Sequence, residues 1–170
     1  MKQIFLPGSK SISNRALVLA AISEKPTLLK KMLDSDDVRY LRGVLENFGV
    51  AFESTSEGLR VIPPKTLKGN ESDNFIGNAG TAARFTVALS LIVSGSFRVS
   101  GIPRMHLRPF GDLMTALSPT GMGIECQGEL GCLPAVFTNP GLEHLETNEI
   151  TIAGDISSQF ITGLLLAAPR

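Results

Sequence analysis

Residues 74–92 read NFIGNAGTAARFTVALSLI and contain three kinds of segment in a fixed order. The run over residues 74–76, which holds an aromatic and a β-branched side chain, is typical of a strand. Gly77 and a polar loop follow, and apolar residues then recur through residues 82–92 at a density typical of a buried helix. The stretch therefore predicts a strand, a glycine-containing loop and a helix, which is the start of an α/β unit.

The same order of segments occurs twice more in the chain. Near the N-terminus, residues 4–6 precede a polar loop and a helical run over residues 16–22. Near the C-terminus, residues 150–152 precede Gly154 and a helical run over residues 160–168. We therefore expect the chain to be built from repeated units, each opened by a strand and a helix.

The first two copies continue with a further strand, a second helix and two more strands. In the first copy these segments are residues 27–29, a helix after Ser35, and strands around residues 50–52 and 59–62. In the second copy they are residues 97–99, 110–117, 124–126 and 135–137. The pattern is a βαβαββ unit, twice complete, and it places the chain in the α/β (α+β) class.

The repeat also suggests how the chain is divided. We expect units of about residues 1–70 and 71–147, followed by an incomplete third unit over residues 148–170. The third unit stops after its first helix, where a strand–helix pair lacks its partners. We therefore expect the 170 residues to be part of a longer protein.

The second helix of the first copy has a well-marked start and end. Ser35 is placed to cap its N-terminus, and Asp36 and Asp37 suit the positive end of a helix dipole. Gly49 suits the position just after its C-terminus. The apolar residues between them fall at helical spacing: Val38, Leu41, Val44, Leu45 and Phe48. We therefore attribute the acidic residues, Asp34 included, to helix stability and not to catalysis.

The composition is that of a globular protein without a large charged interface. Hydrophobic residues make up 43% of the chain and charged residues 19%, and 16 basic side chains balance 16 acidic ones. Nucleic-acid and membrane-binding surfaces need a basic excess, so neither kind of partner is expected. No apolar run approaches the roughly 20 residues of a membrane-spanning helix, and the first residues lack a signal-peptide pattern. We therefore expect a cytoplasmic protein.

The sequence gives no sign of a metal site or of disulfides. Cys126 and Cys132 are its only cysteines, and they lack the spacing and the histidine partners of a zinc site. We expect both to be reduced residues of the core. The two histidines, His106 and His144, are expected at the surface or behind a site.

Polar side chains gather where each repeated strand leads into its helix. Unpaired backbone N–H groups at such junctions form a natural anion site, and three junctions can converge on one face. The residues added there are Lys10, Ser11, Ser13, Asn14 and Arg15, then Asn78, Gly80, Thr81 and Arg84, then Ser157, Ser158 and Gln159. A further basic cluster over residues 104–109 opens the second helix of the second copy. Cations, hydroxyls and amides suit a phosphorylated, polyhydroxylated ligand.

Each of these features also has a purely structural interpretation. Taken alone, Lys10 and Arg15 are more often part of a solvated helix face, and residues 78–80 are more often a turn. For Arg84 and Arg104, the choice between structural pairing and electrostatic support of a site stays open.

Five motifs make the pattern specific. In chain order they are residues 7–16 (PGSKSISNRA), 33–39 (LDSDDVR), 77–84 (GNAGTAAR), 104–111 (RMHLRPFG) and 157–160 (SSQF). They are similar in kind, order and spacing to the motifs of the 5-enolpyruvylshikimate-3-phosphate synthases, also called 3-phosphoshikimate 1-carboxyvinyltransferases. One glycine-rich loop would be weak evidence, whereas an ordered set along essentially the whole chain is specific.

This resemblance implies the enolpyruvyl transferase-like fold, an inverse α/β barrel with two domains of three βαβαββ units each. The chain would form part of one domain, and the active site would lie between the two. The resemblance also implies a reaction in chorismate and aromatic amino acid biosynthesis. The 5-hydroxyl of shikimate 3-phosphate adds to C2 of phosphoenolpyruvate, and the intermediate then loses phosphate. The herbicide glyphosate occupies the phosphoenolpyruvate pocket in this family. No cofactor is implied, and the parent enzyme is expected to be a monomer.

The resemblance assigns residues to the two substrates. Lys10 is placed between them and is the candidate catalytic residue. The shikimate 3-phosphate side comprises Lys10, Ser11, Arg15, Ser157, Ser158 and Gln159. The phosphoenolpyruvate side comprises Lys10, Asn78, Gly80, Arg108 and Gln159. The chemistry agrees, because glycine permits close approach to a small anion and arginine can grip a carboxylate or phosphate with two hydrogen bonds.

Two segments depart from the family pattern, and two alternatives stay open. Leu107 stands where a charged residue is common, and residues 118–123 replace a Leu/Gly/Ala-rich helix end, with Pro119 expected to shorten that helix.

One alternative is the UDP-N-acetylglucosamine enolpyruvyl transferase, which shares the fold but uses a reactive loop cysteine. The other is a non-catalytic ligand-binding fragment, because the family's proton-transfer groups lie outside these residues. We expect the isolated chain to be inactive and to self-associate through the apolar run 161–167.

Overall fold

The fold was analysed in a computed structural model, which describes residues 6–147, 149–155 and 157–169. Its first half contains α1 (Lys10–Ala21), β1 (Thr27–Leu29), α2 (Asp36–Asn47), β2 (Ala51–Thr55) and β3 (Gly58–Ile62). Its second half contains β4 (Asp73–Phe75), α3 (Gly80–Leu89), β5 (Gly95–Ser100), α4 (Gly111–Leu117), β6 (Gly123–Cys126), β7 (Ala135–Asn139) and α5 (Ser158–Ala167). Short 3₁₀ turns cover Met105–Leu107, Ser118–Thr120 and Leu142–His144.

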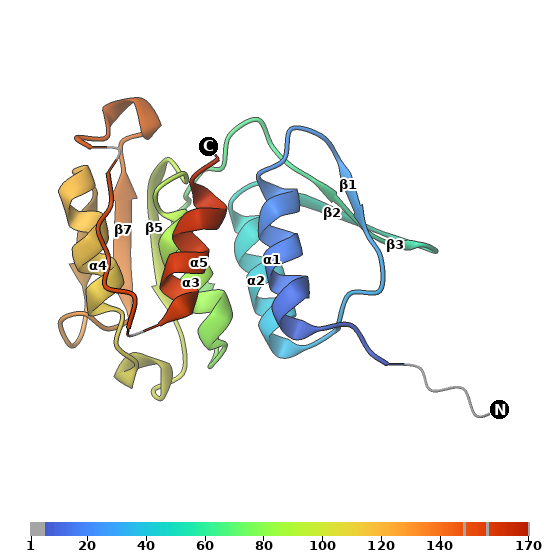
Figure 1. Cartoon of the computed structure of the whole chain (residues 1–170), viewed down its shortest axis with the longest axis horizontal. Coiled ribbons are helices and arrows are strands. Elements are labelled where there is room, and N and C mark those ends of the chain that lie inside the picture. Colours follow the sequence, from blue (N-terminus) through green and yellow to red (C-terminus); the bar gives the residue numbers. More distant parts are fainter. Residues whose placement is uncertain (1–5, 148, 156, 170) are drawn as a thin grey trace.

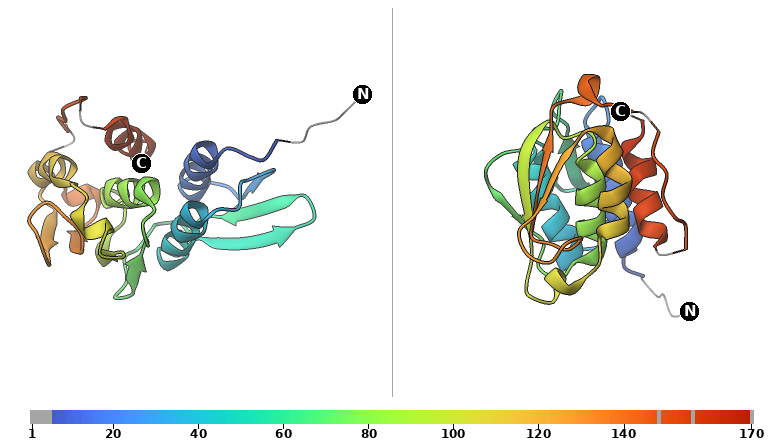
Figure 2. Two further views of the ribbon diagram at one scale, coloured as in Figure 1. Left: turned by 90° about the horizontal axis from the view of Figure 1, so that it is seen from below. Right: turned by 90° about the vertical axis from the view of Figure 1, so that its left-hand side faces the viewer.

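The strands form two separate sheets, each from one contiguous part of the chain. The first sheet has the order β1-β3-β2 and is antiparallel throughout, with Thr27 and Phe52 on either side of Val61. The second has the order β4-β5-β7-β6, in which β4 runs parallel to β5 and the other pairs are antiparallel. The β2–β3 hairpin extends away from the helices (Figure 2). The chain is therefore a mixed α/β structure, as its pattern of alternating elements predicts.

The helices form one layer of nearly parallel rods with α3 at its centre (Figure 1). α3 packs against α2 and against α5, and every residue of α3 except Arg84 is buried. A helix that is apolar on almost all sides requires such a position between other elements. The contact with α5 is close because Gly163 faces Ala88, where a Cβ on the glycine would lie only 2.8 Å from the alanine Cβ.

An aromatic cluster connects the two halves of the chain. The ring of Phe48, just after α2, lies 4.8 Å from that of Phe97 on β5, measured between ring centroids. Phe97 in turn stacks on Phe137 of β7 at 5.7 Å. Each such pair adds about 0.5–1.5 kcal/mol beyond the burial of its surface, so the cluster fixes α2 against the second sheet.

Most of the elements expected from the sequence are present, but three helices begin earlier than predicted. α1 begins at Lys10 and not at residue 16, α3 at Gly80 and not at residue 82, and α5 at Ser158 and not at residue 160. The N-cap of α1 is Ser9, whose Oγ accepts a hydrogen bond from the N–H of Ile12 at 3.4 Å. The polar residues interpreted as loops are therefore the first turns of helices.

α2 and α4 agree with their predicted limits. The five apolar residues expected to face the core from α2 and its C-terminal end, from Val38 to Phe48, are all buried, and Gly49 has the positive φ of +94° expected after a helix end. α4 ends at Leu117, and Pro119 lies in the 3₁₀ turn that follows, as predicted. Ser35 does occupy the position before α2, but its hydroxyl makes no capping hydrogen bond, so that part of the prediction was wrong.

The predicted strand over residues 150–152 is absent from the structure. Its counterpart in the second unit, β4, is held by a parallel pairing with β5, the strand that follows α3. No described strand follows α5, so residues 150–152 have no equivalent partner. Ile150 and Ile152 instead pack against the edge of the core. Of the strand predicted over residues 4–6, only Leu6 lies within the described residues, and it is not in a strand.

Candidate active site

The first turns of α1, α2, α3 and α5 meet at one end of the helix layer. They surround a cavity of about 200 Å³ together with the turn that precedes α4. Its lining residues are Lys10, Asp37, Asn78, Gly80, Thr81, Arg84, Arg108 and Gln159. Backbone N–H groups are unpaired at helix starts, and the helix dipoles are positive there. The arrangement therefore suits a small anion.

All five residues expected on the phosphoenolpyruvate side line this cavity. They come from four separate parts of the chain: Lys10, then Asn78 and Gly80, then Arg108, then Gln159. Asn78 leaves its side-chain oxygen buried without a hydrogen-bond partner within the described part of the chain. An unpaired buried acceptor of this kind is costly unless a ligand or water supplies a donor. The cavity thus offers cations, amide groups and one unused acceptor to a ligand.

Gly80 allows two arginines to approach the start of α3. A Cβ at this position would collide with the guanidinium of Arg108 and lie 2.8 Å from Nη1 of Arg84. Both clashes involve the ends of flexible side chains, so a methyl group would displace the guanidinium groups and not the backbone. Glycine therefore determines how far the two cations reach into the cavity.

Arg84 supports the site from the second turn of α3. Its Nη1 donates to the carbonyl oxygen of Gly80 at 3.1 Å and to Oε1 of Gln159 at 3.3 Å. Its guanidinium carbon also lies 5.8 Å and 5.6 Å from the ring centroids of Phe110 and Phe160. Burial, and then repulsion from Arg108, lower the pKa of the Arg84 guanidinium below its ordinary value. The question left open by the sequence is thus answered for Arg84, which lines the cavity and orients Gln159.

Lys10 makes an ion pair that the sequence did not reveal. Its Nζ lies 3.2 Å from Oδ1 of Asp37, in the first turn of α2. The neighbouring Asp36 is 83% exposed and lies 3.8 Å from the guanidinium of Arg39 instead. Asp34 accepts two hydrogen bonds from Arg39, which lower the pKa of its carboxyl group. Of the three acidic residues attributed to helix stability, only Asp37 lines the cavity.

The residues expected only on the shikimate 3-phosphate side lie at the same helix starts but do not line the cavity. Arg15 donates to the carbonyl oxygen of Ser11 at 3.0 Å, and its guanidinium carbon lies 5.7 Å from the centroid of the Phe85 ring. Ser157 caps α5 by accepting a hydrogen bond from the N–H of Gln159 at 3.3 Å. Ser158 is exposed. The roles of these four residues stay predictions.

The remaining residues singled out by the sequence lie elsewhere. Arg104 is exposed, and His144 is exposed beside Glu143. His106 is half-buried, and its Nε2 accepts a hydrogen bond from the N–H of Gly101 at 3.3 Å. Both cysteines are free, as predicted, and burial is the main cause that raises the pKa of the Cys132 thiol. Within residues 6–147, 149–155 and 157–169, no group of three or more potential ligands is placed to hold a metal ion.

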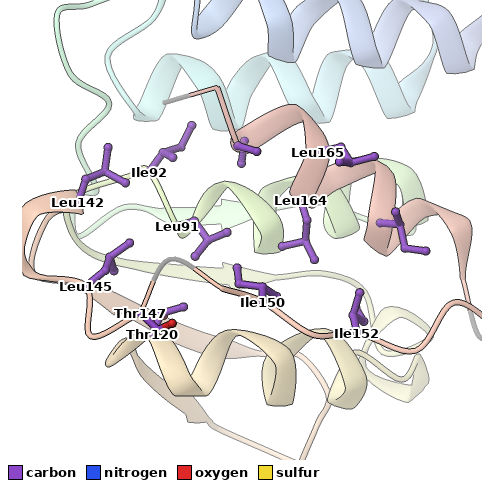
Figure 3. Close-up of a pocket in the computed structure, with 13 residues that line it drawn as sticks. Leu91, Ile92, Thr120, Leu142, Leu145, Thr147, Ile150, Ile152, Leu164 and Leu165 are labelled. Carbon is purple, nitrogen blue, oxygen red and sulfur yellow. The ribbon is translucent and has the colours of Figure 1, made fainter.

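A larger hollow lies along the later turns of α5, and its character is different (Figure 3). It has a volume of about 540 Å³ and is lined almost entirely by aliphatic side chains, among them Leu91, Leu145, Ile150 and Leu164. Thr120 and Thr147 are its only polar lining residues among those described. We call this hollow the apolar groove. Among the described residues that line it, none has a charged or amide side chain.

Comparison with known proteins identifies the family. The sequence profile described as EPSP synthase (3-phosphoshikimate 1-carboxyvinyltransferase) matches residues 1–170. The chain belongs to the EPSP synthase family. It is 42% identical over 165 residues to the 3-phosphoshikimate 1-carboxyvinyltransferase of Bordetella avium and 43% identical over 166 residues to that of Nitrosomonas europaea. Each alignment covers 96% of this chain, but only 37% and 38% of the respective relative.

Solved structures of the EPSP synthase family and its relatives agree with the fold. The chain is similar to an EPSP synthase from Acinetobacter baumannii, with a TM-score of 0.78 and 25% identity over 98% of this chain and 37% of that one. The enolpyruvyl transferase NikO from Streptomyces tendae has a TM-score of 0.56 at 13% identity, over 93% of this chain and 35% of that one. The enolpyruvyl transferase-like fold expected from the motifs is thereby confirmed. Among the described residues, no helix combines the length and the apolar character of a membrane span.

Proposed function

We propose that this chain forms one side of the active site of a 3-phosphoshikimate 1-carboxyvinyltransferase. The complete enzyme transfers the enolpyruvyl group of phosphoenolpyruvate to the 5-hydroxyl of shikimate 3-phosphate and releases phosphate. The proposal rests on one observation. A single small polar cavity is lined by Lys10, Asn78, Gly80, Arg108 and Gln159. The chain spans about 37–38% of the curated relatives reported above, so the remaining groups are assigned to the rest of the parent enzyme.

In this proposal the cavity takes phosphoenolpyruvate. Its phosphate and carboxylate need several donors at close range, and charge-assisted hydrogen bonds from arginine and lysine are the strongest available. Arg108 grips one anionic group with two N–H donors, and Lys10 and Gln159 contact both substrates. Gly80 lets the anion come near the backbone N–H groups at the start of α3. Donors fixed before the substrate arrives also stabilise charge that develops during reaction.

Shikimate 3-phosphate is assigned to the open side of the same helix starts. Ser11 and Arg15 lie in the first two turns of α1, which also contacts α5. Ser157 and Ser158 open α5, where their hydroxyls and the positive end of the helix dipole suit the 3-phosphate. Gln159 then lies between the two substrates, with its Oε1 held by Arg84.

The proposal also covers the localisation, oligomeric state, cofactors and partners of the parent enzyme. We propose that the parent enzyme works as a cytoplasmic monomer, without a metal or an organic cofactor. Its partners are then the two small-molecule substrates, with no nucleic acid and no membrane. The UDP-N-acetylglucosamine enolpyruvyl transferase is less well supported, because the family match and the Bordetella and Nitrosomonas relatives all carry the other name.

The test is an assay of phosphate release by the full-length enzyme. Release is expected only when shikimate 3-phosphate and phosphoenolpyruvate are both present, and replacement of the former by UDP-N-acetylglucosamine should abolish it. Lys10→Ala should reduce release to background, whereas Lys25→Ala, at an exposed lysine outside the cavity, should leave it unchanged. Release with the UDP-sugar, or equal activity of the two lysine variants, would contradict the proposal.

A further inference from the structure

The described lining of the cavity has an excess of positive charge that one carboxylate partly offsets. Lys10, Arg84 and Arg108 bring three cations to it, and Asp37 is the only carboxylate among its described lining residues. The guanidinium groups of Arg84 and Arg108 both lie beside Gly80, and repulsion from Arg108 is, after burial, a cause of the lowered pKa of Arg84. Without a ligand, therefore, a flexible lysine would be driven out of the cavity towards solvent.

The position of Lys10 in its helix adds to this tendency. Lys10 is the first residue of α1, where the positive end of the helix dipole disfavours a cation. Its side chain is still 48% exposed, and a lysine loses much rotamer freedom when it is held in one place. A specific partner is therefore needed to keep its ammonium group at the cavity.

Asp37 has the geometry of that partner. Its carboxylate lies 3.2 Å from Nζ of Lys10 and is only 19% exposed. It belongs to the first turn of α2, where the helix dipole favours a negative charge, so α2 fixes the carboxylate independently of any ligand. Asp36 belongs to the same turn but is 83% exposed and directed to Arg39.

We propose that Asp37 is a positioning residue for Lys10. It holds the ammonium group at the cavity before either substrate binds, so that no lysine rearrangement is needed in the transition state. The consequence for turnover rests on the proposed function, whereas the contact itself does not. Since Asp37 also adds negative charge beside an anion site, its removal should slow the reaction without weakening phosphoenolpyruvate binding.

The first experiment compares Asp37→Asn with Asp36→Asn in the full-length enzyme. Both variants remove a carboxylate from the first turn of α2, and only the first removes the partner of Lys10. Loss of a preorganised position costs about 10- to 100-fold in rate, so Asp37→Asn should lower kcat by that factor. It should leave the KM for phosphoenolpyruvate unchanged or lower, and Asp36→Asn should change neither constant. Asp37→Glu, which keeps the charge, should recover part of kcat, and Asp37→Ser, which also removes the carboxylate, replaces Asp37→Asn if that variant does not fold.

The second experiment does not depend on turnover. Acylation of lysines in the full-length enzyme by acetic anhydride is followed by peptide mass spectrometry, with exposed Lys25 as the internal reference. Asp37→Asn should increase labelling of Lys10 relative to Lys25, and Asp36→Asn should not. If the wild-type enzyme releases no phosphate, the proposed function fails, and this ratio still decides whether Asp37 holds Lys10. Equal effects of the two asparagine variants on labelling and on kcat would overturn the inference.

Discussion

Two hollows lie at different ends of the α3–α5 helix pair, and they differ in volume and in the chemistry of the side chains that line them. The cavity at the helix starts is small, about 200 Å³, and is lined by charged and amide side chains. The apolar groove towards the helix ends is larger, about 540 Å³, and is lined by leucine and isoleucine. α5 contributes to both, with Gln159 at one and Leu164 and Leu165 at the other. The apolar groove is the larger of the two, but the chemistry of the lining favours the cavity as the site for an anion.

The largest expected effect concerns the chain by itself. The cavity supplies only one side of the proposed site, and moving protons while positioning two substrates requires groups from both sides. The isolated 170-residue chain should therefore release phosphate from shikimate 3-phosphate and phosphoenolpyruvate no faster than background. Turnover that disappears in the Lys10→Ala variant of the isolated chain would show that one side is sufficient.

Next in size is the effect of Arg108, with Arg104 as its matched control in the same segment. Arg108→Ala removes a guanidinium from the cavity, and Arg104→Ala removes an exposed one outside it. Loss of a charge-assisted bidentate contact costs about 2–3 kcal/mol, or roughly a 30- to 150-fold rise in the KM for phosphoenolpyruvate. The KM for shikimate 3-phosphate should change far less. Steady-state kinetics of both full-length variants decide the assignment, and equal changes in the two KM values would refute it.

A smaller and more selective effect is expected at Gly80. A methyl group there meets Arg108 and Arg84. In the proposed site, where the family resemblance implies that glyphosate occupies the phosphoenolpyruvate pocket, the longer inhibitor would have less room to adjust than the substrate. Gly80→Ala in the full-length enzyme should weaken glyphosate inhibition by at least about tenfold, within the range for one methyl group in a pocket. The KM for phosphoenolpyruvate should rise less, and the wild-type enzyme should be sensitive. If glyphosate inhibits the wild-type and Gly80→Ala enzymes equally, the assignment of Gly80 to the phosphoenolpyruvate pocket is refuted.

The apolar groove gives the smallest effect, on association and not on catalysis. Leu165 is 67% exposed beside it, so the isolated chain should self-associate through this face. Leu165→Glu should reduce association measured by sedimentation velocity, whereas Leu130→Glu, at a 91% exposed leucine outside the groove, should not. A monomeric wild-type chain in which the α5 amides are well protected from hydrogen exchange would contradict this prediction, because the groove would then be stable without a second copy packed against it.

The contrast between the two hollows also shows what the sequence could predict. Apolar periodicity located α2, because burial of one face requires it, and the density of apolar residues located α3 and α5. The helix starts were misplaced because Lys10, Gly80 and Ser158 look like loop residues until the cavity that they face is known. Strand pairing was not predictable for residues 150–152, since a strand depends on a partner elsewhere in the chain.

Asp37 shows the same limit within the site. Asp36 and Asp37 are adjacent and both suit the start of α2, so no local rule separates them. Only the packing of α1 against α2 brings Lys10 within 3.2 Å of one and not the other. The resemblance to the family motifs, by contrast, was sufficient to select Asn78, Gly80, Arg108 and Gln159, which line one cavity despite their distance in sequence.

The measurement that tests the central claim most directly is hydrogen–deuterium exchange of the full-length enzyme with and without shikimate 3-phosphate plus glyphosate. If the cavity is the site, amides in the first turns of α1, α3 and α5 and around Arg108 should become protected. Amides that border the apolar groove, over residues 142–147 and 149–152, should exchange unchanged. Protection confined to the groove, with the helix starts unaffected, would contradict the account.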